Sequence, residues 1–295
     1  RCNIQTMDRG VIPVNTYVLN LMVSGTGKGH STNILEQEFM SHFKKEFLET
    51  VFPDKAEENM QTLAEEIASF RVAKGHTAMP EAEEVEIQKD KLQKQWERLG
   101  ELAFSFDSAT APAVKQMREK LLLAGAGSVN CEIDEFGSNM TSNAEALNVF
   151  LELYDVGRIK QKLIKNTIES TRSMELPGNT PTNLMMFGTP TKLLDGDRVE
   201  DEFKQFLETG FARRLLFGYT TESTRTKHDS PAERYAQMVD NTLSTETRAI
   251  QQLFGSFAHR TFNPVLHVSK ENSIYLIAYQ MDCEKRAEEF KVFNS

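Results

Sequence analysis

The sequence predicts an α/β fold, in which a parallel β-sheet is flanked by helices and carries an inserted helical hairpin and a mixed C-terminal extension. Three apolar segments support this prediction, and each ends in polar residues. The first, residues 14–23, ends in the stretch Ser24-Gly25-Thr26-Gly27-Lys28-Gly29-His30-Ser31. The second, residues 129–133, ends in Asp134 and Glu135, and the third, residues 183–189, ends in Thr189. Helix-like stretches separate these segments, as crossovers between parallel strands require.

The glycine-rich stretch predicts a phosphate-binding loop between a strand and a helix, that is, a P-loop. Glycines let the backbone turn so that its N–H groups point inward, and Lys28 supplies a positive charge. The start of the following helix adds a partial positive charge. We therefore expect residues 24–31 to bind the phosphates of ATP. The alternative is a flexible turn before a helix.

Two positions depart from the usual phosphate-loop pattern. Met22 stands where that pattern has a glycine, and Gly29 stands where it has a serine or threonine that contacts Mg²⁺. The nearest hydroxyl groups belong to Ser31 and Thr32, so Ser31 is the expected magnesium ligand, with Thr32 or a water-mediated contact as the alternative. His30 is expected to pack or to contact a phosphate.

Asp134 and Glu135 predict the second half of an ATPase site. A strand that ends in two carboxylates, downstream of a phosphate loop, supplies one acid for Mg²⁺ and one for the attacking water. We expect Asp134 to hold Mg²⁺ and Glu135 to activate the water. The alternative is a surface turn with two acids.

Thr189 is a candidate sensor of the γ-phosphate, because a polar residue at the end of a strand beside the loop lies near that group. Asn183 and Thr191 are rival candidates. The alternative is an ordinary Gly-Thr-Pro turn.

Arg213 and Arg214 are candidate arginine fingers. An arginine that reaches across a subunit interface can stabilise the charge that develops on the γ-phosphate. Arg214 is slightly preferred, and the alternative for both is a surface salt bridge.

A basic cluster between the second and third apolar segments predicts a contact with DNA. Lysines at alternating positions suit phosphate contacts from a strand or loop. The alternative is a solvated charged face. The cluster consists of Arg158, Lys160, Lys162 and Lys165.

Composition sets limits on the class of protein. The 295 residues are 39% hydrophobic and 26% charged, which fits a globular protein. A net charge of −9 argues against a uniformly basic nucleic-acid-binding surface. Three widely spaced cysteines predict inert thiols in a reducing compartment, hence the cytoplasm. No apolar run is long enough to cross a membrane. The chain starts with Arg1, as expected of a fragment of a longer protein.

The expected elements divide the chain into three parts. Residues 1–53 and 102–220 form the ATPase core, 54–101 an inserted charged arm, and 221–295 the C-terminal extension. Expected helices cover residues 31–52 (ended by Pro53-Asp54), 55–73, 81–103, 112–124, 143–154, 198–209 and 231–260. Further expected strands cover residues 104–107, 129–133, 183–189 and 211–219. A β-hairpin is expected within 165–180, and apolar segments 265–268 and 273–279 precede a closing helix. The arm is expected to be solvated, with a subunit contact as the alternative.

The order of motifs resembles a family of phage and mobile-element P-loop ATPases that lie beside or within primase and polymerase polypeptides and are akin to viral replicative ring helicases. The resemblance covers roughly residues 10–220. It rests on the glycine-rich stretch, Asp107 to Pro112, Ile133 to Gly137, Leu184 to Pro190 and Gly210 to Phe217. It implies an ATP-driven motor on single-stranded DNA, a homo-oligomeric ring and a primase or polymerase partner. It also implies the roles given above to Lys28, Asp134, Glu135 and the two arginines.

The expected function is therefore that of a DNA helicase motor. Three alternatives remain open: an ATP-dependent loader or switch that does not translocate, a nucleotide kinase (suggested by Gly27-Lys28-Gly29), and a scaffold with a decayed site.

Overall fold

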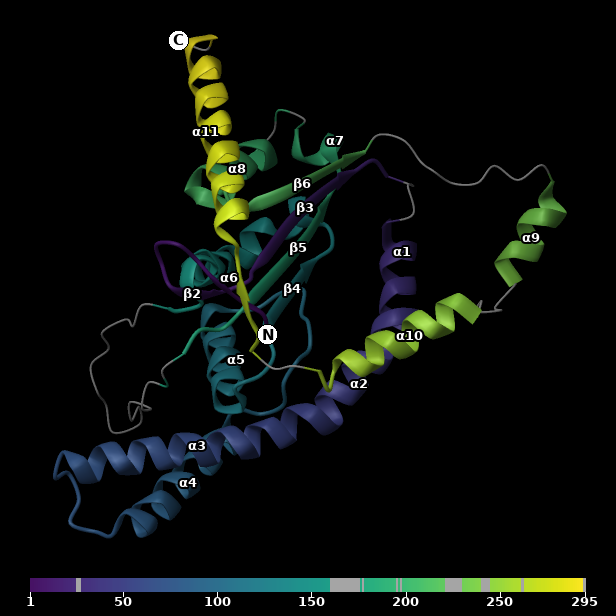
Figure 1. Cartoon of the computed structure of the whole chain (residues 1–295). Helices are drawn as coiled ribbons and strands as arrows, with labels where there is room; N and C mark the ends of the chain where they lie inside the picture. The colour runs from purple at the N-terminus through teal and green to yellow at the C-terminus, as the bar shows by residue number, and fades with distance from the viewer. Residues whose placement is uncertain are drawn as a thin grey trace.

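A computed structural model describes residues 1–24, 28–159, 176, 178–194, 196, 198–220, 230–239, 245–260 and 263–293. Its centre is a four-stranded sheet in the order β4-β5-β3-β6, and all of the pairs are parallel (Figure 1). The strands are β3 (Thr16–Met22), β4 (Val129–Ile133), β5 (Thr182–Gly188) and β6 (Leu215–Thr220). Helices flank this sheet, which confirms the predicted α/β class.

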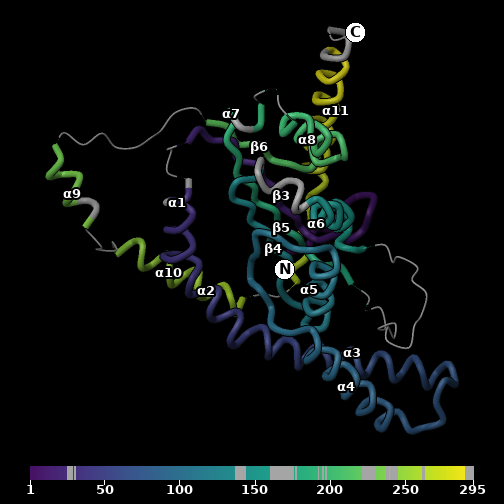
Figure 2. The backbone as a smooth tube through the Cα atoms, turned by 180° about the vertical axis from the view of Figure 1, so that it is seen from behind, coloured from purple at the N-terminus to yellow at the C-terminus, as the bar shows by residue number. Residues whose placement is uncertain are grey.

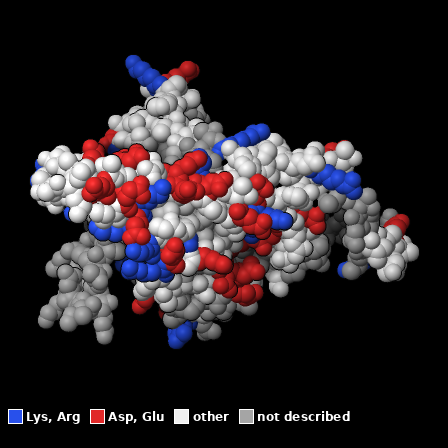
Figure 3. All heavy atoms as spheres, turned by 90° about the horizontal axis from the view of Figure 1, so that it is seen from below, with Lys and Arg blue, Asp and Glu red and all other residues white. Residues whose placement is uncertain are grey.

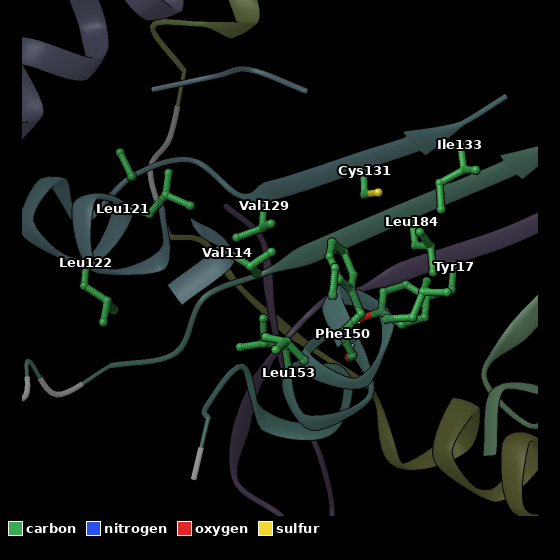
Figure 4. Close-up of a cluster of buried hydrophobic side chains, with 14 of the residues drawn as sticks. Tyr17, Val114, Leu121, Leu122, Val129, Cys131, Ile133, Phe150, Leu153 and Leu184 are labelled. Carbon is green, nitrogen blue, oxygen red and sulfur yellow. Dashed lines mark hydrogen bonds between the residues drawn. The ribbon is translucent and has the colours of Figure 1, made fainter. Parts of the chain in front are cut away.

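One face of the sheet carries the main core. On β4, Val129, Cys131 and Ile133 are buried, whereas Asn130 and Glu132 between them are only half-buried. Figure 4 shows the buried side chains of β4 beside those of the two helices that cover this face. These helices are α5 (Ala111–Ala124) and α6 (Phe136–Val156). The alternation follows from the period of two along a strand, and it places polar side chains on the opposite face.

Tyr17 fixes the centre of this core. Its side chain is 1% exposed and lies between Phe150 and Tyr154 of α6. The hydroxyl group donates to the Phe150 carbonyl oxygen at 2.6 Å and lies 2.9 Å from the Thr182 hydroxyl. Burial raises the pKa of Tyr17 well above its ordinary value. The phenol thus stays neutral and joins β3, β5 and α6.

A long helical segment leaves the sheet after β3. Its five parts are α1 (Lys28–Ile34), the π-helical η1 (Leu35–Met40), α2 (Ser41–Glu46), the π-helical η2 (Phe47–Val51) and α3 (Phe52–Ala73). Residues at each junction keep right-handed helical backbone angles, so the segment is continuous. The prediction that Pro53 ends a helix is therefore wrong. The Phe52 N–H bonds to the Phe47 carbonyl across the wider π turn, which makes room for the proline ring.

The predicted helical hairpin is formed by α3 and α4 (Glu81–Arg98), which lie side by side below the sheet in Figure 1. Arg71 of α3 donates to buried Glu84 of α4 at 2.6 Å. Trp96 packs on Phe52, with their ring centroids 5.3 Å apart, and the Lys120 ammonium group lies 4.2 Å above the Trp96 ring. The base of the hairpin thus contacts α5. Helix α4 ends at Arg98, earlier than predicted, because Gly100 takes a positive φ of 68°.

Other boundaries differ from those predicted. The expected strand at 104–107 is reduced to one bridge between Phe106 and Cys131. Helix α6 begins at Phe136, seven residues before its predicted start. The predicted hairpin at 165–180 lies largely outside the described residues. The remaining helices are α7 (Pro190–Leu193), α8 (Arg198–Phe206), the π-helical η3 (Leu207–Phe211), α9 (Pro231–Val239) and α10 (Thr245–Phe257).

The C-terminal part returns to the start of the chain. A small second sheet joins β1 (Asn3–Gln5), β2 (Val11–Pro13) and β7 (Val265–His267) in the order β2-β1-β7. Helix α10 lies against α2 in both views of the backbone (Figures 1 and 2). Residues 273–279 belong to α11 (Lys270–Phe293). Within the described residues, no helix is long and apolar enough to span a membrane.

Candidate functional site

The ends of three neighbouring strands define the candidate site, which we call the carboxyl edge. Ser24 follows β3, Thr189 follows β5 and Asp134 follows β4. In register, Leu21 pairs with Gly188 and Ile133 with Met186, so all three strands end at the same side of the sheet. Since adjacent strands lie about 4.8 Å apart, the ends of β3 and β4 are separated by roughly 10 Å.

The strand order makes this edge suitable for a ligand. The chain passes from β3 to β4, returns to place β5 between them, and then adds β6 on the other side of β3. Parallel α/β sheets bind ligands outside the carboxyl ends of their strands, where successive connections diverge in direction. Such a point lies beside β3, at the loop that the sequence predicts to bind phosphate.

The described ends of the predicted phosphate loop have the expected arrangement. Strand β3 ends at Met22, and α1 begins at Lys28. Ser24 and Gly29 are exposed, and so is Ser31, which lies three residues after Lys28 and so on the same side of the helix. Gly25, Thr26 and Gly27 lie outside the described residues, as do the side chains of Lys28 and His30.

Buried neighbours hold Asp134 and Glu135 at the edge. Ile133 and Phe136 are both 0% exposed, whereas the two acids between them are exposed. Phe136 packs edge-on against Phe206, with ring centroids 4.8 Å apart. Glu135 has a φ of 22° and a ψ of 55°, a backbone conformation that L-residues rarely adopt. Such backbone strain is found at functional sites when the surrounding packing enforces it.

Glu132 is a residue of this region that sequence reasoning missed. It lies on the half-buried face of β4. Burial, followed by the charges of Glu36 and Asp134, raises its pKa, and the Lys44 charge opposes this shift. Lys44 forms an ion pair with Glu36. The only sequence signal was a charged residue inside an otherwise apolar strand, and this signal does not reveal which helix lies nearby.

The geometry separates the three sensor candidates. Thr189 follows β5 directly, is half-buried and precedes α7, where its carbonyl oxygen accepts the Leu193 N–H at 3.2 Å. Asn183 lies near the amino end of β5, and its amide donates to Asn130 at 2.9 Å. Thr191 is exposed within α7. Thr189 is therefore the candidate at the carboxyl edge itself.

The two finger candidates have different environments. The Arg214 side chain is 8% exposed and donates to the Gly210 carbonyl oxygen and to Asp155, each at 2.9 Å. Its Nε atom is buried with no partner in the described part of the chain. Arg213 is exposed. Both precede β6, so they lie at the amino side of the sheet. The geometry thus favours Arg213 over Arg214 for any contact outside its own chain.

The predicted DNA cluster is described only at its first member. Arg158 is exposed, and its Nε atom donates to Asn179 at 2.7 Å. Lys160, Lys162 and Lys165 lie outside the described residues. Seen from below, the molecule shows more acidic than basic side chains (Figure 3), so that face is unsuited to a polyanion.

A magnesium ion at the carboxyl edge would depend on the nucleotide. Among the described residues, no group of three or more His, Cys, Asp or Glu side chains can hold a metal. Mg²⁺ in nucleotide sites, however, binds through one or two carboxylates together with phosphate oxygens. Exposed Asp134 and the Ser31 hydroxyl fit that kind of site.

No protein-family model, no curated protein and no solved structure matches the chain.

Proposed function

We propose that the chain is a P-loop ATPase, the motor domain of a phage-type replicative DNA helicase that couples ATP hydrolysis to movement on DNA. The observation that carries the proposal is the carboxyl edge. It brings the end of β3, which leads into the glycine-rich stretch, next to Thr189 and then to Asp134 and Glu135. The phosphate loop and the acidic pair are separated by one strand. This spacing suits a site in which the loop binds the γ-phosphate and the acids serve Mg²⁺ and the attacking water.

Each residue of the edge has a role in hydrolysis. The loop N–H groups and Lys28 bind the phosphates of ATP, and Asp134 and Ser31 hold Mg²⁺. When bound, Mg²⁺ neutralises charge on the phosphate oxygens. Glu135 accepts a proton from water as the water oxygen attacks the γ-phosphorus and the bond to the ADP oxygen breaks. Thr189 contacts the γ-phosphate and distinguishes ATP from ADP.

The arginine finger comes from a second copy of the chain, which makes the motor an oligomer, most simply a ring. Exposed apolar side chains on β6 support such assembly. Leu216 is 65% exposed, Phe217 52% and Tyr219 67%, and this strand is at the edge of the described sheet. Arg213 lies just before this strand and would reach a neighbour along the same interface.

The DNA part of the proposal rests on the basic cluster of residues 158–165 and on the family resemblance. Single-stranded DNA is the expected substrate of the motor, and a primase or polymerase is its expected partner in the host cytoplasm. An ATPase of this type is also compatible with a loader that does not translocate.

The decisive experiment measures ATP hydrolysis with and without single-stranded DNA. Glu135→Gln is expected to abolish hydrolysis while ATP binding is retained, because only the proton acceptor is lost. Glu145→Gln is a matched control, since Glu145 is an exposed residue on α6. Lys28→Ala is expected to abolish ATP binding.

Each alternative has its own outcome. Hydrolysis that DNA does not stimulate, with Lys160→Ala and Lys162→Ala variants unchanged, supports the loader. Transfer of phosphate from ATP to a nucleoside monophosphate supports a kinase. Full hydrolysis by Glu135→Gln, or ATP binding that survives Lys28→Ala, contradicts the site.

A further inference from the structure

A cavity of about 140 Å³ lies at the amino end of β4, the end opposite Asp134. Its walls come from parts of the chain that are far apart in sequence: the N-terminus, the long helical segment, residues 102–104, the start of β4 and the end of α10. Four phenyl rings and two guanidinium groups dominate the lining: Phe43, Phe47, Phe104, Phe257, Arg1 and Arg260.

The small sheet explains why the two arginines meet. Strand β1 pairs with β7 in parallel, with Asn3 opposite Val265. The Asn3 N–H also donates to the Pro264 carbonyl oxygen at 2.9 Å. Arg1 and Arg260 precede these two strands, so the pairing brings both to one end of the sheet.

The phenyl rings form a preorganised apolar wall. Phe43 and Phe47 stack at 5.9 Å with an angle of 3° between their planes. Phe104 stands edge-on to both, at 5.9 Å from Phe43 and 6.3 Å from Phe47. Phe257 is 38% exposed, and the Arg260 guanidinium group lies 4.9 Å from its ring centroid. An aromatic wall next to an exposed cation therefore borders the cavity.

The charge of the cavity is positive in an otherwise acidic chain. No lining residue is acidic. Arg1 donates to four backbone carbonyls, those of Leu121 at 2.6 Å, Gly127 at 3.0 Å, and Ala126 and Asn179 at 3.4 Å, and none of the described carboxylates pairs with it. Burial, and then the nearby Arg118 charge, lowers the pKa of Arg1 to about 10, so the group remains charged at neutral pH. These carbonyls occupy the Arg1 donors and offset its charge only in part, so Arg1 adds positive charge to the cavity and exposed Arg260 is the arginine placed to contact an anion.

We infer that this cavity binds a pyrimidine nucleotide, with the base against the phenyl wall and the phosphate group beside Arg260. Cavities of about 150 Å³ hold a single benzene ring, so the cavity fits one six-membered ring and favours a pyrimidine over the larger two-ring purine. Aromatic side chains bind bases through stacking, and arginine binds the attached phosphate. The nucleotide is part of single-stranded DNA or a free mononucleotide.

The inference goes beyond the ATPase site, because the cavity and the carboxyl edge lie at opposite ends of β4. It is tested without ATP, so it can fail or succeed independently of hydrolysis. The assay is fluorescence anisotropy of labelled oligo(dT), with oligo(dA), an abasic oligonucleotide of equal length and free dTMP as competitors.

Two variants and one matched control test the cavity. Arg260→Glu and Phe257→Leu are each expected to weaken oligo(dT) binding about tenfold or more, through loss of a charged contact and of stacking. Arg248→Glu makes the same charge change at an exposed site on α10 that does not line the cavity, and it is expected to change binding less than about threefold. Circular dichroism checks that all three remain folded.

The outcomes distinguish the sources and test the inference. Competition by dTMP as strong per base as that by oligo(dT) identifies a mononucleotide site, whereas much stronger competition by oligo(dT) identifies a strand site. A photocrosslink from a thiothymine-containing strand to the peptide that carries Phe257 supports either. Equal losses from Arg260→Glu and Arg248→Glu, equal binding of abasic and oligo(dT) strands, or no binding at all overturns the inference.

Discussion

Replacing Arg214 with methionine is expected to destabilise the fold without removing a catalytic group. Loss of one partner of a buried ion pair costs about 3–5 kcal/mol, and this value falls to about 2–3 kcal/mol here because water can reach the remaining acid. That acid, Asp155, has a 46% exposed side chain. Methionine also removes the buried Nε atom, which has no hydrogen-bond partner among the described residues, and its removal returns about 1 kcal/mol. The net cost is therefore about 1–2 kcal/mol.

Arg213→Met is the matched variant at the neighbouring position. Because Arg213 is exposed, its replacement is expected to change the free energy of unfolding by less than about 0.5 kcal/mol. Because Arg213 is the proposed finger, however, Arg213→Met is expected to lower the rate of ATP hydrolysis by about 10³-fold. At temperatures at which both variants are folded, Arg214→Met is expected to lower this rate far less.

Thermal unfolding followed by circular dichroism gives the stability, and phosphate release gives the rate. The net cost for Arg214→Met corresponds to a drop of roughly 2–6 °C in Tm. An unchanged Tm for Arg214→Met would refute the argument about the buried pair. Hydrolysis at the wild-type rate by Arg213→Met would refute its assignment as the finger.

Three further predictions concern the carboxyl edge and β4. Glu135→Gly is expected to stop hydrolysis and yet stabilise the protein by about 1 kcal/mol in chemical denaturation, because glycine relieves the positive φ; a lower stability would contradict this. Glu132 has a raised pKa in the folded state, so its ionisation opposes folding; this penalty is complete above the raised pKa, decreases as the pH falls through it and is gone below the ordinary pKa of glutamate. Glu132→Gln should therefore raise Tm at pH 8 more than at pH 5, and an equal change at both would show that the shift is absent. Burial raises the pKa of Cys131 to about 12, so a thiol reagent should label it only after unfolding; rapid native labelling at Cys131 would contradict the core.

Features that depend on neighbouring residues in the sequence could be predicted from it. Strand β4 covers the same residues as the alternation of apolar and polar side chains that predicted it. Thr110 caps α5, where its hydroxyl oxygen accepts the Ala113 N–H at 3.4 Å. The sequence also predicted that Asp134 and Glu135 would follow a buried strand. These features depend on neighbours within a few residues, and so they can be derived without the fold.

Features that depend on distant partners could not be predicted in this way. The ion pair of Arg214 joins residues 59 positions apart, so nothing within a few residues of Arg213 favours it over Arg214. Pro53 does not end the helix because a rare π turn before it changes the hydrogen-bond pattern. Arg1 and Arg260 meet only through the pairing of β1 and β7.

The position of Arg213 in the fold determines which copy of the candidate site it can reach. It precedes β6, a strand of six residues, while the candidate site lies beyond the carboxyl ends of the strands. At about 3.3 Å per residue the two are roughly 20 Å apart along the sheet, too far for one side chain within the same chain. An arginine finger at Arg213 must therefore act at the site of a neighbouring copy of the chain.

A mixture of inactive Arg213→Met and inactive Glu135→Gln chains should regain hydrolysis, because some interfaces join an intact site to an intact finger. The rate per chain should also fall on dilution below the assembly concentration. Mixtures that stay inactive, although light scattering shows mixed oligomers, would exclude a finger supplied between subunits.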